Sequence, residues 1–115
     1  MAEYRDGRAL QGYQHLRQNT ELTWLQDPGA TTEVLSGAFY QPLGRSSSHQ
    51  LWSSAMVLSP AIRGLFGVEA DALQHTLRVA PQLPAEWDGA TLRNVSVGGD
   101  RFTVCLLYTS PSPRD

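Results

Sequence analysis

The chain has 115 residues, of which 41% are hydrophobic and 17% are charged, and it carries a formal net charge of −2. The length suits one small domain, and the composition excludes a fully disordered protein. A negative net charge gives no electrostatic basis for binding nucleic acid or an anionic membrane, and no apolar run is long enough to cross a bilayer. Every basic residue is arginine, which we interpret as the codon bias of a GC-rich bacterial genome and not as a phosphate site.

The first segment predicts a helix. Leu10, Tyr13 and Leu16 recur three residues apart, so they share one side of a helix that begins after an Asp6 cap. Gly12 weakens this prediction, because glycine is a poor helix former. The helix is expected to stop at the Asp-Pro-Gly turn that begins at residue 27, since the residue before proline is pushed out of helical geometry.

A loop and a second helix follow. Residues 35–48 are rich in Gly, Pro and Ser and predict a loop. Ser47 and Gln50 have the spacing of a capping box ahead of a helix that ends or kinks at Pro60. A further short helix over residues 60–67 should close at Gly67. The predicted inner face of the second helix consists of Leu51, Trp52, Ala55, Met56 and Ser59.

The pattern changes from helical to β-stranded after about residue 73. Residues 75–81 and 90–104 show β-branched residues and alternation, with a Gly98-Gly99-Asp100 turn inside the second run. Helices first and strands afterwards indicate an α+β chain with two parts, not an alternating α/β sheet. We therefore divide the chain into residues 1–72 and residues 73–104.

The last eleven residues, 105–115, form a third segment. The string CLLYTSPSPRD matches, residue for residue, the in-frame translation of a common transposase-type sequencing adaptor. We interpret this segment as an artefact of metagenomic assembly and exclude it from the fold. Cys105, the single cysteine, then carries no information on the redox compartment, and the natural chain is expected to continue beyond Val104.

Three stretches of the chain carry a family resemblance. They are GATTEVLSG, the run from Phe39 to Val68, and LRVAPQLPAEWDGATLRNVSVGG. Their order resembles the C-terminal end of bacterial six-hairpin glycosidases, similar to glycogen-debranching amylo-α-1,6-glucosidases and more distantly to α-L-rhamnosidases. The resemblance implies that residues 1–72 are the last helices of an α/α toroid. Residues 73–104 would then be the first strands of a β-rich C-terminal domain.

The resemblance also implies a function. The parent protein would be a glycoside hydrolase that acts on an oligo- or polysaccharide with inversion of configuration, which requires a carboxylic acid and a carboxylate base on opposite sides of the bond. It places the base at Glu33. The rhamnosidase pattern sets its glutamate two residues later, where this chain has Leu35, so the debranching-like pattern fits better. The acid would lie upstream, because the resemblance supports neither Glu21 nor Asp27, and the isolated fragment would then be inactive.

Four further residues are candidates for binding the carbohydrate. Tyr40 and Trp52 could stack on a sugar ring, and Gln41 and His49 could bind its hydroxyls. The alternatives stay open: Glu33 can instead be a solvated carboxylate or a partner of an arginine such as Arg45, and His49 and Trp52 can belong to the core. Trp87 is expected to pack between the strands and the helices.

Neither a cofactor nor a metal is expected. The three histidines lie too far apart in sequence for the usual ligand spacing of zinc. The alternative function is a small non-catalytic module that binds carbohydrate or a protein partner. A toroid that has lost catalysis and retains binding is a third hypothesis. The residues do not predict the sugar, the linkage, the oligomeric state or the cellular compartment.

Overall fold

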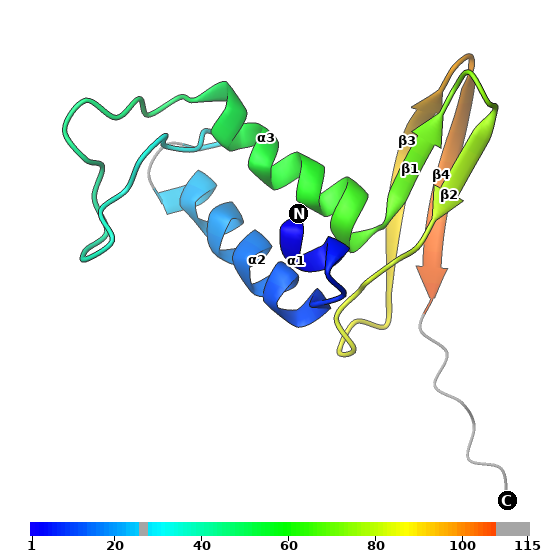
Figure 1. Ribbon diagram of the computed structural model, residues 1–115, viewed down its shortest axis with the longest axis horizontal. Coiled ribbons are helices and arrows are strands. Elements are labelled where there is room, and N and C mark those ends of the chain that lie inside the picture. The colour runs from blue at the N-terminus through cyan, green and yellow to red at the C-terminus, as the bar shows by residue number, and fades with distance from the viewer. Residues whose placement is uncertain (26–27, 108–115) are drawn as a thin grey trace, which may run out of the picture.

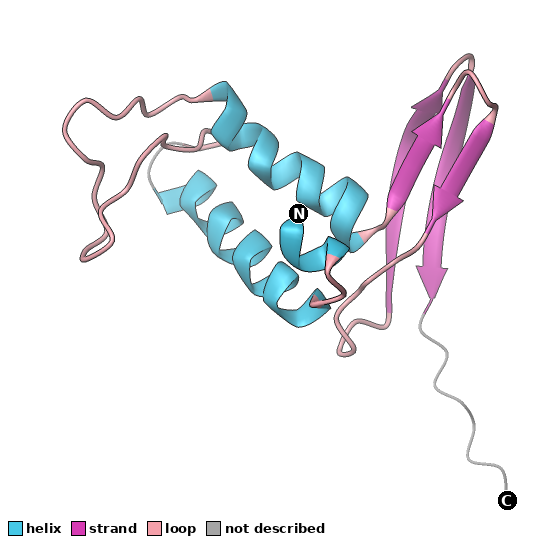
Figure 2. Cartoon of the chain, viewed as in Figure 1, coloured by secondary structure: helices cyan, strands magenta, loops and turns pink. Residues whose placement is uncertain are grey.

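Helices and strands occupy separate parts of the chain. The computed structural model describes residues 1–25 and 28–107. Figure 1 shows a helical half, a long projecting loop and a half made of two β-hairpins, and Figure 2 separates them by secondary structure. The order of helices before strands confirms the predicted α+β class.

The helical half begins with two helices instead of one. Helix α1 covers Ala2–Arg5 and helix α2 covers Ala9–Leu25. The predicted Asp6 cap is wrong, because Asp6 ends α1 and its N–H donates to the carbonyl of Ala2 at 3.0 Å. Gly7 follows with φ of +73°, a left-handed conformation that interrupts the helix before α2 begins.

Helix α3 covers Leu51–Ser59 and begins later than the predicted capping box. Gln50 occupies the N-cap position with an extended backbone, and no side chain caps the helix. Ser47 is instead held in the preceding loop, where its carbonyl accepts a hydrogen bond from Glu33 N–H at 2.9 Å. Pairing with a distant segment therefore replaced the local cap that the spacing predicted.

Pro60 changes the helix without ending it. The chain continues directly from α3 into the π-helical segment η1, Pro60–Leu65. The N–H of Phe66 donates to the carbonyl of Ala61, five residues earlier, at 3.0 Å. A proline lacks the N–H of the normal ladder, and a wider turn is one way in which a helix accommodates that loss.

Gly67 ends this helix, as predicted. Its φ is +62°, and a Cβ at this position would overlap the carbonyl of Ala80. The N–H of Ala80 donates to the Gly67 carbonyl at 2.9 Å. Only glycine satisfies both the left-handed backbone and the close approach of the second chain segment.

The strands form two antiparallel hairpins. Strand β1 (Val68–Asp71) pairs with β2 (Thr76–Val79), and β3 (Gly89–Val97) pairs with β4 (Asp100–Leu107). The predicted strands correspond to β2, β3 and β4, and Gly98 and Gly99 connect the last two. Strand β1 was missed, so the strands begin at Val68 and not near residue 73.

Strand β4 includes the first residues of the adaptor-like segment. Cys105 and Leu107 pair with Thr91 and Gly89 of β3. Backbone pairing therefore continues across the predicted boundary at residue 105. The rest of that segment, residues 108–115, lies outside the described residues.

The hydrophobic core lies between the helices. Tyr4, Leu16 and Leu65 are at most 7% exposed and form one cluster. The ring of Tyr4 lies over two glycines of neighbouring helices, and a Cβ at Gly12 or Gly64 would crowd it. Packing against Tyr4 therefore requires glycine at position 12, although glycine is a poor helix former.

The predicted inner face of α3 is wrong for its largest members. Leu51, Trp52 and Met56 are 83%, 61% and 57% exposed, whereas Val57 and Ala61 pack against the core. The reason is geometric: α2 and α1 are the described helices that contact this segment, and they cover only one of its sides. The opposite side keeps its large apolar side chains in solvent.

Candidate functional site

The loop between α2 and α3 carries most of the predicted site residues. We call residues 31–50 the arm; it projects from the ends of the two helices (Figure 1). Its two sides are tied together, because Gln50 N–H donates to Thr31 O at 3.2 Å and Leu43 N–H donates to Val34 O at 3.2 Å. Nearer its tip, Ser36 N–H donates to Gln41 O at 3.0 Å. The arm is thus an irregular hairpin.

Glu33 lies in the base of the arm. Its backbone N–H donates to Ser47 O at 2.9 Å, and its Oε2 accepts a hydrogen bond from Ser47 N–H at 3.3 Å. The residue is partly exposed. This double link orients the carboxylate across the arm and leaves its other oxygen open to further partners.

The predicted pairing of Glu33 with Arg45 is not observed. Arg45 is exposed, and it forms no ion pair with any residue in the described ranges. The Glu33 carboxylate instead accepts a hydrogen bond from the backbone N–H of Ser47. The helix start expected near Ser47 is also absent there, since α3 begins at Leu51.

Tyr40 and Gln41 lie in the outer part of the arm. Tyr40 is 53% exposed and its neighbour Phe39 is 60% exposed. Gln41 N–H donates to Phe39 O at 2.9 Å, which forms a tight turn. The structure therefore separates this aromatic pair in the outer arm from Glu33 in its base.

His49 and Trp52 lie where the arm enters α3. His49 Nδ1 is 2.8 Å from Ser48 Oγ, and Trp52 in the first turn of the helix is 61% exposed. The alternative of a core position is therefore wrong for both residues, because both are exposed. His49 follows Ser47 by two residues, so it lies near Glu33 along the arm.

None of the five candidate residues lines the best-formed cavities of the described chain.

Within residues 1–25 and 28–107, no contact links Glu33 to a second carboxylate. Glu21 is engaged with Arg17, at 2.9 Å between Oε1 and Nε, and Asp27 lies outside the described residues. The part of the chain that the structure describes contains no group of three metal-ligating side chains. Among the same residues, no helix is both long and apolar enough to cross a membrane.

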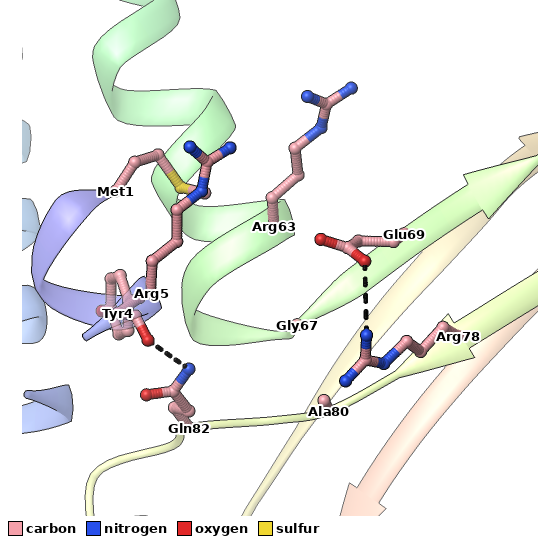
Figure 3. Close-up of a pocket in the computed structure, with 9 residues that line it drawn as sticks. All are labelled: Met1, Tyr4, Arg5, Arg63, Gly67, Glu69, Arg78, Ala80 and Gln82. Atoms are coloured by element: carbon pink, nitrogen blue, oxygen red, sulfur yellow. Dashed lines mark hydrogen bonds and ion pairs between the residues drawn. The ribbon is translucent and has the colours of Figure 1, made fainter. Parts of the chain in front are cut away.

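Two cavities were not anticipated. One, of about 490 Å³, is an apolar groove beside Tyr13, Trp24 and Trp87, in which Tyr13 and Trp87 meet edge to face at 5.7 Å. Trp87 was predicted to pack between the strands and the helices, and this contact confirms the helix side of that prediction. The other, of about 340 Å³, lies between the helices and the first hairpin (Figure 3). Neither could be found from spacing, because each joins residues more than fifty positions apart.

The comparisons with known proteins do not assign the chain to a family. It matches no protein-family model, no curated protein and no solved structure.

Proposed function

We propose that this chain is the C-terminal part of a bacterial six-hairpin glycoside hydrolase, with Glu33 as its general base. In this proposal, α2, α3 and η1 are late helices of an α/α toroid, and the β-hairpins begin a C-terminal domain. The reaction is hydrolysis of a glycosidic bond in an oligo- or polysaccharide, with inversion. The general acid is supplied by an earlier helical hairpin.

The observation that carries the proposal is the unfinished packing of a helical pair. Helices α2 and α3 run side by side in opposite directions (Figure 1). One side of α3 contacts the core, while Leu51 and Met56 on its other side are more than half exposed. In a toroid, further hairpins cover such a side, and a large exposed apolar surface is unusual for a complete monomer.

The position of Glu33 suits the proposed role. Its link to Ser47 N–H holds the carboxylate in the base of the arm, the segment that joins α2 to α3. A general base in an inverting hydrolase must accept a proton from the attacking water and must stand about 6.5–9.5 Å from the acid. A backbone donor can orient the carboxylate for this task while one oxygen stays available to water.

Four other residues complete the proposed substrate site. Trp52 and Tyr40 present exposed aromatic rings that can stack on the apolar face of a sugar. Gln41 and His49 carry donors and acceptors for its hydroxyl groups. Their separation along the arm implies that Tyr40 and Gln41 bind a more distant sugar unit than the residues beside Glu33.

The test begins with the source DNA, resequenced across both ends without a transposase adaptor. The proposal requires an upstream frame that encodes further helical hairpins. In that longer protein, Glu33→Gln should lower kcat by at least about a thousandfold with little change in KM, because the base acts in the transition state. Exposed Glu86→Gln is the matched control and should leave kcat unchanged. A stop codon directly before Met1, or full activity of Glu33→Gln, would contradict the proposal.

The rival is a small non-catalytic binding module. It is favoured by the exposed aromatic tip of the arm, where Phe39 and Tyr40 are both more than half exposed. Titration of the 115-residue chain with oligosaccharides discriminates the two: a module binds without further hairpins and loses binding on Tyr40→Ala. A toroid that binds but does not cleave is excluded if the longer protein is active and Glu33→Gln removes that activity.

A further inference from the structure

The cavity between the helices and the first hairpin concentrates positive charge. It is an open pocket bounded by α1, η1, β1 and β2, with a volume of about 340 Å³. Three of its lining side chains are arginines: Arg5, Arg63 and Arg78. Glu69 is the only carboxylate among the lining residues. The excess of positive charge contrasts with the net charge of −2 of the whole chain.

Two of these arginines lack an acidic partner. Arg78 Nη1 lies 4.0 Å from Glu69 Oε2, so that pair is partly compensated. Arg5 and Arg63 form no ion pair within residues 1–25 and 28–107. Figure 3 shows their guanidinium groups extending on the same side of the pocket, whereas Arg78 turns towards Glu69. Two uncompensated guanidinium groups on neighbouring elements attract an anion.

The walls of the pocket are held by contacts that do not involve its arginines. Gln82 Nε2 donates to the Tyr4 carbonyl at 3.1 Å and joins α1 to the segment after β2. Gly67 and Ala80 are hydrogen-bonded at 2.9 Å on the other side. Arg5 and Arg63 are therefore carried by elements whose relative positions are fixed by other residues. The backbone around the pocket is therefore set before a ligand arrives, and the exposed Arg5 and Arg63 side chains can turn towards it.

We propose that this pocket binds the phosphate group of a small phosphorylated molecule, with Arg5 and Arg63 as its main ligands. A phosphate monoester carries a charge of about −1.5 to −2 at pH 7, which matches two uncompensated guanidinium groups. Arginine binds phosphate oxygens through paired N–H donors. The volume suits a small molecule, since ligand cavities start near 300 Å³.

This inference rests on the cavity and not on the arginine-rich composition. Codon bias explains why every basic residue is arginine, but it does not explain why three of them line one pocket while acidic groups are few there. The inference is also independent of the glycosidase proposal. The pocket is formed by α1, η1 and the first hairpin, and none of the residues proposed to bind sugar lines it.

The test is calorimetric titration of the 115-residue chain with glycerol 3-phosphate, inorganic phosphate and acetate, with ionic strength held constant by sodium chloride. We expect saturable binding of glycerol 3-phosphate, weakened at least about tenfold by Arg5→Gln and by Arg63→Gln, because charge-assisted hydrogen bonds are lost. Arg101→Gln, on exposed β4, is the matched control and should not change the affinity. Glu69→Gln should strengthen binding, since it removes the opposing charge.

The outcomes are distinguishable. Inorganic phosphate binding as tightly as the ester supports the site and shows that the phosphate group alone is recognised. No saturable binding by the folded chain, equal binding of acetate, or equal losses in the Arg63→Gln and Arg101→Gln variants overturns the proposal. Circular dichroism of each variant verifies folding, and Arg63→Lys provides a second variant that keeps the charge but loses the paired donors. It should bind with an affinity between those of the unmodified chain and Arg63→Gln.

Discussion

The two sides of the helix formed by α3 and η1 differ in how far their apolar side chains are buried. On one side, Val57, Ala61 and Leu65 pack on a core that includes Tyr4. On the other, Leu51 and Met56 are mostly exposed although they are equally apolar. Apolar character therefore does not determine which side is buried; the position of the neighbouring helices does. Four predictions test this contrast, ordered by the size of the change that we expect.

Leu16→Ala should have the largest effect. Leu16 is 7% exposed in the core, and truncating it leaves a cavity, so the free energy of unfolding should fall by about 2–4 kcal/mol. Leu51→Ala is the matched control at 83% exposure and should change it by less than about 0.5 kcal/mol. Urea denaturation followed by circular dichroism measures both, and similar losses in the two variants would contradict the described burial.

Gly67→Ala should have the next largest effect. Its φ of +62° and its contact with Ala80 leave no room for a Cβ, so we expect a loss of about 1–3 kcal/mol. The control is Gly99→Ala, where an added Cβ would have no neighbour within 4 Å. If both substitutions were tolerated equally, the junction between η1 and β1 would have to adopt another conformation.

Tyr4→Phe should have a smaller effect, and of the opposite sign. The Tyr4 hydroxyl is buried without a hydrogen-bond partner in the described chain, so its removal should stabilise the fold by about 1 kcal/mol. Burial, with a further contribution from Tyr13, raises the pKa of Tyr4 from 10.0 to about 12. The unfolded state then loses this proton first, and stability should decline as the pH rises from 10 towards 12. The decline should be smaller in Tyr4→Phe; equal pH profiles would contradict the burial of the hydroxyl.

Trp52→Ser should have the smallest effect on stability. Because Trp52 is 61% exposed, the free energy of unfolding should change by less than about 0.5 kcal/mol. Self-association, measured by analytical ultracentrifugation, should decrease, since the substitution removes part of an exposed apolar surface. Met56→Ser on the same side of α3 should act likewise. Unfolding of either variant would show that this side is buried.

The arm shows which structural features local sequence patterns predict and which they miss. Its Gly, Pro and Ser content correctly predicted a loop, and Gly67 and the Gly98-Gly99 turn were also located correctly. The Ser47 cap was wrong because Ser47 pairs with Glu33, fourteen residues away, which local propensity does not take into account. Strand β1 was missed because three of its four residues, Glu69, Ala70 and Asp71, are poor strand formers, whereas β2, equally short, contains Thr76 and Val79. The roles of Glu33, Tyr40, Gln41, His49 and Trp52 stay predictions.

Local sequence patterns were enough to predict the α+β class, the order of helices before strands, the helix end at Gly67 and the turn at Gly98 and Gly99. These features depend on backbone conformation and on short-range periodicity, which neighbouring residues decide. Three features became visible only in the folded chain. They are the buried side of α3, the packing of Tyr4 against Gly12, and the cavity that Arg5, Arg63 and Arg78 share. Such contacts join residues that are distant in the chain, and packing between elements, not local propensity, selects them.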